Sequence, residues 1–472
     1  MATPVGSDWV VYDLIVIGGG PAGYHGASLA GKNGLKTLLI EKAALGGVCL
    51  NSGCIPSKTW LYAAKIYAGA KDGAAYGVRA EKISFDQQRL IARKNKVVKI
   101  LAAGVKNQLA KNNVQVVVAK GEIVGCDDTG FQVKAGDEYY RGKNLLLATG
   151  SVPVIPSIPG LEPARRNGMV LTNEEIFNLS RVPSTLVVIG GGVIGLEMAA
   201  YFNAVGSKVT VVEVRDRIGG EIDRDIAAVL LDNYRKKGVD FRLNTRVTGV
   251  DGQGVKIKTG DGEEIIPAEH VLLSVGRQPL LSGFGLENLG PVLEEGRLRV
   301  DCSGRTSVPG LYAAGDVNGR SMLAHTAYRE AEVCISQLLG RTEEVNYEAI
   351  PAVIYTDPEV ASVGETPESA ARKGLAVETV TLSMRYSGRY VAEHEGGDGL
   401  CKLVFTRPER RLIGAHLITE HASELIYGAG MMIDRKMKVE EIKKVVFPHP
   451  TIGEIFKEAV FSLPEGENNG LS

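Results

Sequence analysis

Two cysteines separated by four residues are the closest pair of reactive side chains in this sequence. Cys49 and Cys54 lie in the segment Gly-Gly-Val-Cys-Leu-Asn-Ser-Gly-Cys-Ile-Pro. Such a pair can bind a metal, form a structural disulfide or cycle between dithiol and disulfide. Zinc normally needs four ligands, and neither a second cysteine pair nor a histidine cluster is visible. We therefore favour a redox-active dithiol, with the other two interpretations as alternatives, and expect no metal.

A histidine far along the chain could handle protons for such a dithiol. His449 lies between two prolines, and Glu454 follows five residues later. The prolines restrict the backbone, and the carboxylate could orient one ring nitrogen while the other moves protons. Disulfide exchange needs a base to form the thiolate and an acid to protonate the leaving sulfur. A lone histidine is more often a surface or packing residue, so this role depends on the dithiol.

A strand, glycine turn, helix and strand pattern occurs twice and must position these groups. The first copy covers residues 14–41 and the second covers residues 186–213. Each copy ends its second apolar run at an acid, Glu41 or Glu213. In both copies the acid lies 18 residues after the last glycine of the turn (23 to 41 and 195 to 213). The repeat predicts either two dinucleotide sites, or one such site and a second copy that no longer binds a dinucleotide.

The Gly-x-Gly-x-x-Gly turns in these copies have a specific chemistry. The first glycine makes the tight turn, the second lets the backbone approach a pyrophosphate, and the third lets helix and strand pack closely. A carboxylate at the tip of the second strand accepts hydrogen bonds from ribose hydroxyls and repels a 2′-phosphate. Glu213 therefore favours NAD over NADP, although Arg215 and Arg217 lie nearby and could hold a phosphate. The alternative is a pair of glycine turns in an unrelated α/β protein.

The remaining apolar periodicity predicts the other elements. We expect a helix over residues 87–111 and a strand over 114–118, and a third strand-to-glycine junction at 311–316. A new region begins near residue 351, and its expected elements are strands at 352–355, 377–382 and 400–405 and helices at 422–432 and 453–461. These elements predict an α/β protein with two Rossmann-like dinucleotide-binding domains and a C-terminal α+β domain.

Composition excludes several classes of protein. Lys and Arg total 54 and Asp and Glu total 55, so there is no electrostatic reason to expect nucleic acid or an anionic membrane as a partner. No apolar stretch approaches the roughly 20 residues that span a bilayer. The first eleven residues carry no basic start or long apolar core, so we expect no secretory signal and a cytoplasmic location. Six cysteines in 472 residues do not make a secreted disulfide scaffold.

The combined motifs resemble the flavin-dependent pyridine nucleotide–disulfide oxidoreductases, and within them most closely the dihydrolipoamide dehydrogenases. The resemblance covers nearly the whole chain. The motifs that carry it are both glycine fingerprints, the cysteine block with Ile55-Pro56-Ser57-Lys58, the segment Ala148-Thr149-Gly150-Ser151, Glu197, the junction Ala314-Gly315-Asp316 with Met322-Leu323-Ala324-His325, and His449-Pro450-Thr451.

The resemblance implies a role for each matching position. The catalytic set would be Cys49, Cys54, His449, Glu454, Lys58 and Glu197. FAD would be held by Gly18, Gly20, Gly23, Glu41, Lys58, Gly121, Thr149, Gly150, Ser151, Asp316, Met322, Leu323, Ala324 and His325. NAD would be bound by Gly190, Gly192, Gly195, Glu197, Glu213, Val247 and Gly276.

The resemblance also implies organisation and partners. The expected segments are an FAD-binding domain with the dithiol (1–155), an NAD-binding domain (156–280), a second FAD-binding segment (281–350) and a dimerisation domain (351–472). A homodimer is implied in which His449 and Glu454 act on the dithiol of the partner subunit. The expected substrate is dihydrolipoamide on a lipoyl domain or lipoyl protein of a 2-oxo acid dehydrogenase or glycine-cleavage system.

Four positions depart from the family pattern, of which Ser52 and Gly453 are merely less usual, and two other functions stay open. Val48 replaces a frequent threonine beside the first cysteine, and Phe447 stands where a second histidine is common. None of the four departures removes a catalytic group, but they bear on flavin potential and rate. The alternatives are a related reductase that resembles glutathione reductase and uses NADPH, and a non-catalytic flavoprotein or redox-sensing subunit of a larger assembly.

Overall fold

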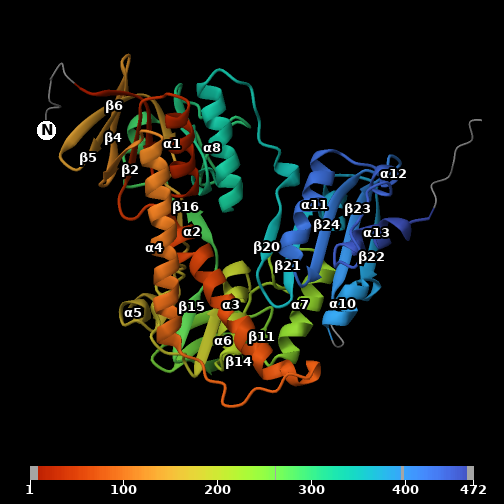
Figure 1. Ribbon diagram of the computed structural model, residues 1–472. Coiled ribbons are helices and arrows are strands. Elements are labelled where there is room, and N and C mark those ends of the chain that lie inside the picture. Colours follow the sequence, from red (N-terminus) through yellow and green to blue (C-terminus); the bar gives the residue numbers. More distant parts are fainter. Residues whose placement is uncertain (1–8, 261, 395–397, 465–472) are drawn as a thin grey trace, which may run out of the picture.

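The computed structural model describes residues 9–260, 262–394 and 398–464. Figure 1 shows three bodies, of which one carries the N-terminal strands and α8, a second lies below it, and the C-terminal quarter of the chain forms the body on the right. The expectation about a secretory start rests in part on residues 1–8, which lie outside the described residues.

The first body is built on a sheet in the order β3-β2-β1-β6-β5-β4, with β19 also paired to β6. Strands β1, β2, β3, β6 and β19 pair in parallel, whereas β4 and β5 form an antiparallel extension. The strands are β1 Val11–Ile17, β2 Thr37–Glu41, β3 Gln115–Val118, β4 Gly121–Asp127, β5 Gly130–Ala135, β6 Glu138–Leu147 and β19 Leu311–Ala313. The helices of this body are α1 Pro21–Lys32, α4 Gln87–Lys111 and α8 Ala324–Leu338.

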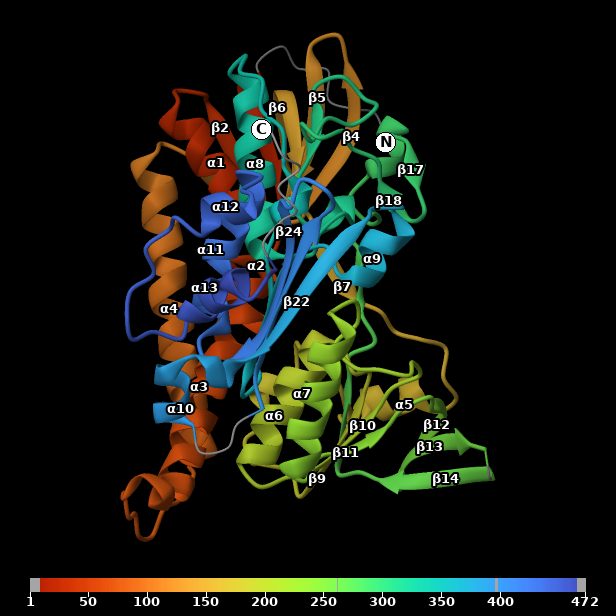
Figure 2. The same cartoon turned by 90° about the vertical axis from the view of Figure 1, so that its right-hand side faces the viewer.

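The second body repeats the parallel plan with the order β11-β10-β9-β15-β8. In both sheets the strand before the glycine turn is central, because β1 lies between β2 and β6 and β9 lies between β10 and β15. The elements are β8 Val170–Leu171, β9 Thr185–Ile189, α6 Val193–Ala204, β10 Lys208–Val212, α7 Arg224–Lys236, β11 Asp240–Arg242 and β15 His270–Leu273. A small antiparallel sheet, β12 Arg246–Asp251, β13 Gly254–Thr259 and β14 Gly262–Pro267, projects from this body (Figure 2).

The third body is an antiparallel sheet in the order β20-β21-β24-β23-β22. Its strands are β20 Ala352–Ile354, β21 Glu359–Gly364, β22 Val377–Ser383, β23 Leu400–Thr406 and β24 Leu412–Thr419, and α11 Ala422–Asp434 and α13 Glu454–Phe461 pack on it. A buried ion pair joins this sheet to the second body, since Lys402 on β23 lies 2.8 Å from Asp223, whose side chain is fully buried. The side chain of Asp223 also caps α7.

The remaining elements lie within these bodies or between them. They are α2 Gly47–Ser52, α3 Cys54–Asp72, β7 Ser151–Pro153, α5 Leu161–Arg166, β16 Arg277–Pro279, α9 Pro367–Arg372, α10 Gly388–Glu393 and α12 Val439–Ile442, together with the small hairpin of β17 Leu293–Glu294 and β18 Arg297–Leu298 and six single-turn helices, η1 Gly73–Tyr76, η2 Ile176–Asn178, η3 Leu286–Leu289, η4 Asp316–Asn318, η5 Tyr347–Ala349 and η6 Met384–Tyr386. Helix α3 runs from the first body towards the second and packs on α6 through Trp60 and Tyr201.

The predicted α/β class with two Rossmann-like units and an α+β C-terminal domain is confirmed. The helix expected over residues 87–111 coincides with α4, and the repeated strand–turn–helix–strand units are β1-α1-β2 and β9-α6-β10. The sequence interpretation did not include α8 or the buried strand β24. Among the described residues, no helix combines the length and apolar character that crossing a bilayer requires. The domain boundaries at residues 155, 280 and 350 stay predictions.

Candidate active site

One cavity of about 1300 Å³ lies where the three bodies meet. Most of the predicted site residues line it, namely Gly18, Gly20, Glu41, Cys49, Cys54, Lys58, Gly121, Thr149, Gly150, Ser151, Glu197, Asp316, Met322, Leu323, Ala324 and His325. The predicted residues outside its lining are Gly23, Gly190, Gly192, Gly195, Glu213, Val247, Gly276, His449 and Glu454. The structure therefore brings together the residues of the expected flavin site and the dithiol. The second glycine turn and the His449–Glu454 pair lie outside this cavity.

The first glycine turn has the shape that a pyrophosphate needs. Gly18 has a φ of 105°, and a Cβ atom there would lie 2.2 Å from the carbonyl oxygen of Ala148. A Cβ atom at Gly23 would lie 1.8 Å from the carbonyl oxygen of Gly18. Gly20 differs, because its conformation is ordinary and the nearest atom to a Cβ there is 3.8 Å away. The chain's own packing demands Gly18 and Gly23, whereas Gly20 leaves free space beside the start of α1.

The second turn repeats this arrangement. Gly190 also has a φ of 105°, and a Cβ atom there would lie 2.5 Å from the carbonyl oxygen of Ser274. A Cβ atom at Gly195 would lie 2.2 Å from the carbonyl oxygen of Gly190, while one at Gly192 would meet nothing within 4 Å. Neither α1 nor α6 has a side-chain cap at its first turn. Unpaired N–H groups at a helix N-terminus beside open space suit a phosphate, so both turns fit a dinucleotide.

The acids at the strand tips have matching surroundings. The Glu41 carboxylate accepts the N–H of Gly19 at 2.6 Å and of Ala43 at 2.8 Å. The Glu213 carboxylate accepts the N–H of Gly191 at 2.7 Å and of Arg215 at 2.8 Å. Each carboxylate oxygen keeps a lone pair after these bonds, so both acids can still accept a ribose hydroxyl. The same negative charge disfavours a 2′-phosphate.

A helix interruption brings the two cysteines to the same cavity. Cys49 lies on α2 and Cys54 is the first residue of α3, with Gly53 between the helices at φ −142° and ψ −115°. In an uninterrupted helix, residues five apart would point about 140° away from each other. A Cβ atom at Gly53 would lie 2.9 Å from the carbonyl oxygen of Val48. The glycine therefore permits the close interruption that pairs the sulfurs.

The two thiols share a proton unequally. Both cysteines are free thiols in the structure. A hydrogen bond from the Cys49 thiol lowers the pKa of Cys54 to about 7, and the positive charge of Lys58 acts in the same direction. The same hydrogen bond, together with burial, raises the pKa of Cys49 far above that of an ordinary thiol. Cys54 is thus the sulfur that carries a thiolate near neutral pH. No three His, Cys, Asp or Glu side chains gather as a metal site within the described part of the chain.

Lys58 stands one helical turn after Cys54, and a buried acid holds it. Its Nζ lies 2.9 and 3.0 Å from the two carboxylate oxygens of Glu197 on α6. The same Nζ lies 4.1 Å above the ring of Tyr355, whose N–H donates to Glu197 at 3.1 Å. Glu197 is only 3% exposed, and Lys58 is the cation that pairs with its carboxylate. Sequence reasoning found Lys58 and Glu197 but missed Tyr355.

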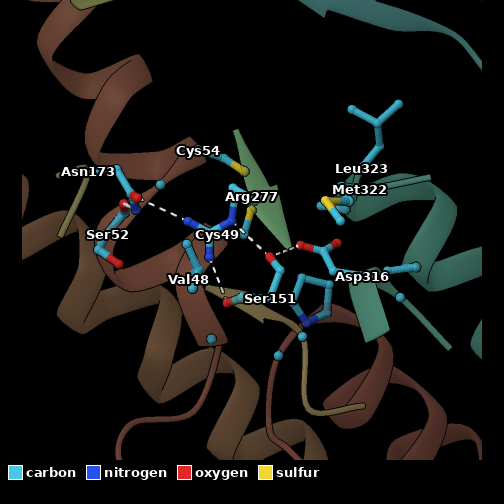
Figure 3. A pocket seen from close by; sticks show the side chains of 18 of the residues that line it. Val48, Cys49, Ser52, Cys54, Ser151, Asn173, Arg277, Asp316, Met322 and Leu323 are labelled. Atoms are coloured by element: carbon cyan, nitrogen blue, oxygen red, sulfur yellow. Dashed lines mark hydrogen bonds between the residues drawn. The ribbon is translucent and has the colours of Figure 1, made fainter. Parts of the chain in front are cut away.

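A chain of hydrogen bonds links side chains that line the cavity, and Figure 3 shows it. The Ser151 hydroxyl donates to Asp316 at 2.5 Å, and Arg277 donates to both Ser151 and Asn173. Arg277 and Asn173 both line the cavity, yet neither was a predicted site residue. Arg277 could have been suspected because it follows Gly276 directly in the sequence. No local sequence signal marks Asn173, since its importance comes only from contacts with distant residues.

The histidine–carboxylate pair is assembled on the surface of the chain. His449 Nδ1 lies 2.8 Å from Glu454, the first residue of α13. The Thr451 N–H donates to the other oxygen of Glu454 at 2.9 Å, and this bond together with His449 holds the pKa of the Glu454 carboxyl below its usual range. The His449 side chain is 79% exposed. The pair is therefore ordered, but it does not reach the dithiol cavity of its own chain.

A cysteine pair in a cavity that receives one dinucleotide turn, in a chain that carries a second such turn outside that cavity, defines a nucleotide-dependent dithiol–disulfide oxidoreductase. Residues 12–331 match the pyridine nucleotide-disulphide oxidoreductase family, and residues 350–460 match the dimerisation domain of the same family. The chain belongs to this family, whose members use FAD and NAD(H) as cofactors.

Curated relatives and solved structures cover nearly the whole chain. A protein named dihydrolipoyl dehydrogenase from Geobacillus stearothermophilus is 37% identical over 96% of this chain and 97% of its own length. The mitochondrial dihydrolipoyl dehydrogenase of Pisum sativum is 36% identical over 95% of this chain and 91% of its own length. The structure of the HOCl-induced flavoprotein disulfide reductase RclA from Escherichia coli superposes with a TM-score of 0.83 at 27% identity, over 96% of this chain and 100% of that one.

The two kinds of glycine should respond differently to alanine. Gly190→Ala forces a Cβ against a carbonyl in a left-handed conformation, so we expect the free energy of unfolding to fall by at least about 1–3 kcal/mol. The Cβ atom of Gly192→Ala would lie in open space, so the free energy of unfolding should change by less than about 1 kcal/mol. NADH binding should weaken at least about tenfold, because the Cβ atom occupies the space beside the pyrophosphate. Thermal unfolding and fluorescence titration with NADH measure both effects. Wild-type NADH affinity in Gly192→Ala would contradict the assignment.

The reduced dithiol should ionise in two well-separated steps. The ultraviolet absorbance of a thiolate, measured against a Cys49→Ser/Cys54→Ser blank, should rise with a midpoint near pH 7, because the Cys49 thiol stabilises the Cys54 thiolate. Below that pH both sulfurs are protonated, and above it one thiolate is present. Lys58→Met should move the midpoint to higher pH, whereas Lys71→Met at the far end of α3 should not. A single midpoint near 9 for both thiols would refute the shared proton.

Proposed function

We propose that this protein oxidises dihydrolipoamide to lipoamide and delivers the electrons to NAD⁺ through the Cys49–Cys54 pair. The observation that carries the proposal is a cysteine pair, beside the Lys58–Glu197 ion pair, in a cavity that also receives a dinucleotide turn. Relatives at 36 and 37% identity bear the name dihydrolipoyl dehydrogenase, which supports this substrate over other disulfides.

The chain's own groups account for the sulfur chemistry. A substrate thiolate attacks the Cys49 sulfur of the disulfide, and Cys54 leaves as the thiolate that its low pKa favours. The second substrate thiol, once deprotonated, attacks the sulfur bound to Cys49, closes the lipoyl ring and frees the Cys49 thiol. Bound FAD supplies the two-electron relay from this dithiol to NAD⁺. Gly18, Gly20 and Glu41 would hold its adenosine diphosphate half, and Gly192 and Glu213 would hold NAD⁺.

The proton transfers require a second copy of the chain. His449 is paired with Glu454 but lies outside the cavity of its own chain, so we propose a homodimer in which it serves the dithiol of the partner subunit. Large apolar side chains support such contact, because Tyr62 and Ile66 on α3 and Tyr427 on α11 are more than half exposed. Glu454 would orient Nδ1 and leave Nε2 to accept the substrate proton.

The partner protein, the cellular compartment and the choice of NAD⁺ over NADP⁺ are also proposals. We expect the dihydrolipoamide to be attached to a lipoyl domain or lipoyl protein of a 2-oxo acid dehydrogenase or glycine-cleavage system. The cytoplasm is the proposed compartment, since the four cysteines outside the pair are free thiols. A reductase that uses NADPH, like glutathione reductase, ranks lower because Glu213 presents a carboxylate to the ribose.

Steady-state turnover against a panel of substrates tests the proposal. We expect dihydrolipoamide with NAD⁺ to be the best pair, glutathione disulfide to be a poor substrate, and NADH to be preferred over NADPH by at least about tenfold, or ~1.4 kcal/mol. The reason is the Glu213 carboxylate at the ribose. Higher kcat/KM for glutathione disulfide with NADPH would replace this function with the alternative one. Flavin-to-dye activity without any disulfide turnover would favour a non-catalytic or sensing role.

His449→Gln should lower dihydrolipoamide turnover by about 10² to 10⁴, the usual contribution of a general acid–base group. The variant should keep its flavin, because His449 does not line the cavity. His270→Gln, on β15 and also outside the cavity lining, is the matched control and should keep wild-type turnover. Turnover within a factor of two of wild type in His449→Gln would remove the residue from the scheme.

A further inference from the structure

An unbroken chain of hydrogen bonds leads from the Asp316 carboxylate to the segment between the cysteines, and Figure 3 shows its part from Asp316 to Asn173. Ser151 Oγ donates to Asp316 at 2.5 Å and accepts from Arg277 Nε at 2.8 Å. Arg277 Nη2 donates to the Ser151 carbonyl oxygen at 2.7 Å, and Nη1 donates to Asn173 Oδ1 at 3.0 Å. Asn173 Nδ2 then donates to the carbonyl oxygen of Ser52 at 2.9 Å.

The donor and acceptor inventory fixes the amide of Asn173 in one orientation. A guanidinium only donates, so Arg277 must face the amide oxygen. The Ser52 carbonyl only accepts, so it must face the amide nitrogen. Asn173 is 6% exposed, which keeps water from competing for either bond. An asparagine satisfies both neighbours, whereas an aspartate of the same size would satisfy Arg277 alone.

The Ser52 carbonyl lies at the point that sets the geometry of the cysteine pair. Ser52 ends α2, Gly53 leaves the helical conformation, and Cys54 begins α3. Carbonyls in the last turn of a helix have no partner within the helix. Asn173 supplies that partner from outside, and it does so at the interruption that brings Cys49 and Cys54 together.

Both side chains lie on segments that directly follow strands of the second body's sheet. Asn173 follows β8, and Arg277 opens β16 four residues after the end of β15. Strands β8 and β15 pair in parallel in the sheet that carries the second glycine turn. The interruption between the cysteines is therefore tied to the nucleotide-binding sheet rather than to a loop of its own body.

We propose that Asn173 is a positioning residue for the redox pair and that Arg277 orients its amide. The bond to Ser52 holds the α2–α3 interruption in the shape that keeps the two sulfurs within reach of each other. Neither residue needs to touch the substrate for this effect. The inference deepens the proposed function and rests on it, because it presumes that Cys49 and Cys54 cycle between dithiol and disulfide.

Asn173→Asp tests the bond to Ser52 directly. Holoenzyme is equilibrated anaerobically with dithiothreitol of set reduced-to-oxidised ratio, and alkylation with mass spectrometry gives the fraction of Cys49–Cys54 disulfide. In this equilibrium the enzyme disulfide gains two electrons and two protons while dithiothreitol closes to its cyclic disulfide. A disulfide forms only within a small range of sulfur positions. If the α2–α3 interruption becomes less well held, the equilibrium constant with dithiothreitol should therefore shift about tenfold towards the Cys49–Cys54 dithiol. The thiolate midpoint near pH 7 should also move to higher pH.

Two further variants separate positioning from charge and from general damage. Asn178→Asp makes the same change five residues later at an exposed position and should leave the constant and the thiolate midpoint unchanged. Arg277→Lys keeps the charge but cannot bond Ser151 and Asn173 together, so it should shift the constant in the same direction by about threefold. It also reports on the chain of bonds without altering Asn173 itself.

The outcomes are distinguishable. A shift in Asn173→Asp and Arg277→Lys, with none in Asn178→Asp, supports the proposal. An unchanged constant in Asn173→Asp, or an equal shift in Asn178→Asp, overturns it. If the wild-type pair does not exchange with dithiothreitol at all, the proposed function itself fails, and the role of Asn173 fails with it.

Discussion

The interruption of the helix at Gly53 is the constraint on which the active site depends. Two cysteines five residues apart cannot meet on a continuous helix, and a side chain at position 53 would press against the Val48 carbonyl oxygen. Once the helix restarts at Cys54, the next turn places Lys58 on the same side as that sulfur. A single glycine thus sets the sulfur pair and the position of the cation whose charge favours the Cys54 thiolate.

The two nucleotide turns show which glycines the chain needs for itself and which it leaves for a ligand. The first and third glycines of each turn are required by backbone contacts within the protein. The middle ones, Gly20 and Gly192, have room for a side chain and ordinary dihedral angles. No contact within the protein requires glycine at these two positions. A pyrophosphate bound against the backbone would require it, because a side chain would occupy the same space.

The sequence was most informative where function depends on local patterns. The glycine turns, the acids Glu41 and Glu213 and the long helix α4 all follow from residues that are close together in the chain. Asn173 and Arg277 could not be inferred in this way, because they meet only after β8 and β16 are brought beside the cysteines by sheet pairing. Strand β24 was missed because no turn signal was assigned around it, although it is the buried centre of its sheet.

The charges around the pair explain why it retains one proton rather than two or none. Lys58 is already paired with the buried Glu197, so the local charge is near zero before the disulfide is reduced. One thiolate on Cys54 is tolerated because Cys49 donates to it, whereas a second thiolate would place two negative sulfurs side by side, which is why the pKa of Cys49 rises. Oxidation of a dithiol substrate releases two electrons and two protons. With one proton kept on Cys49, the other must leave the site, and the His449–Glu454 pair is the acceptor that the proposed dimer would supply.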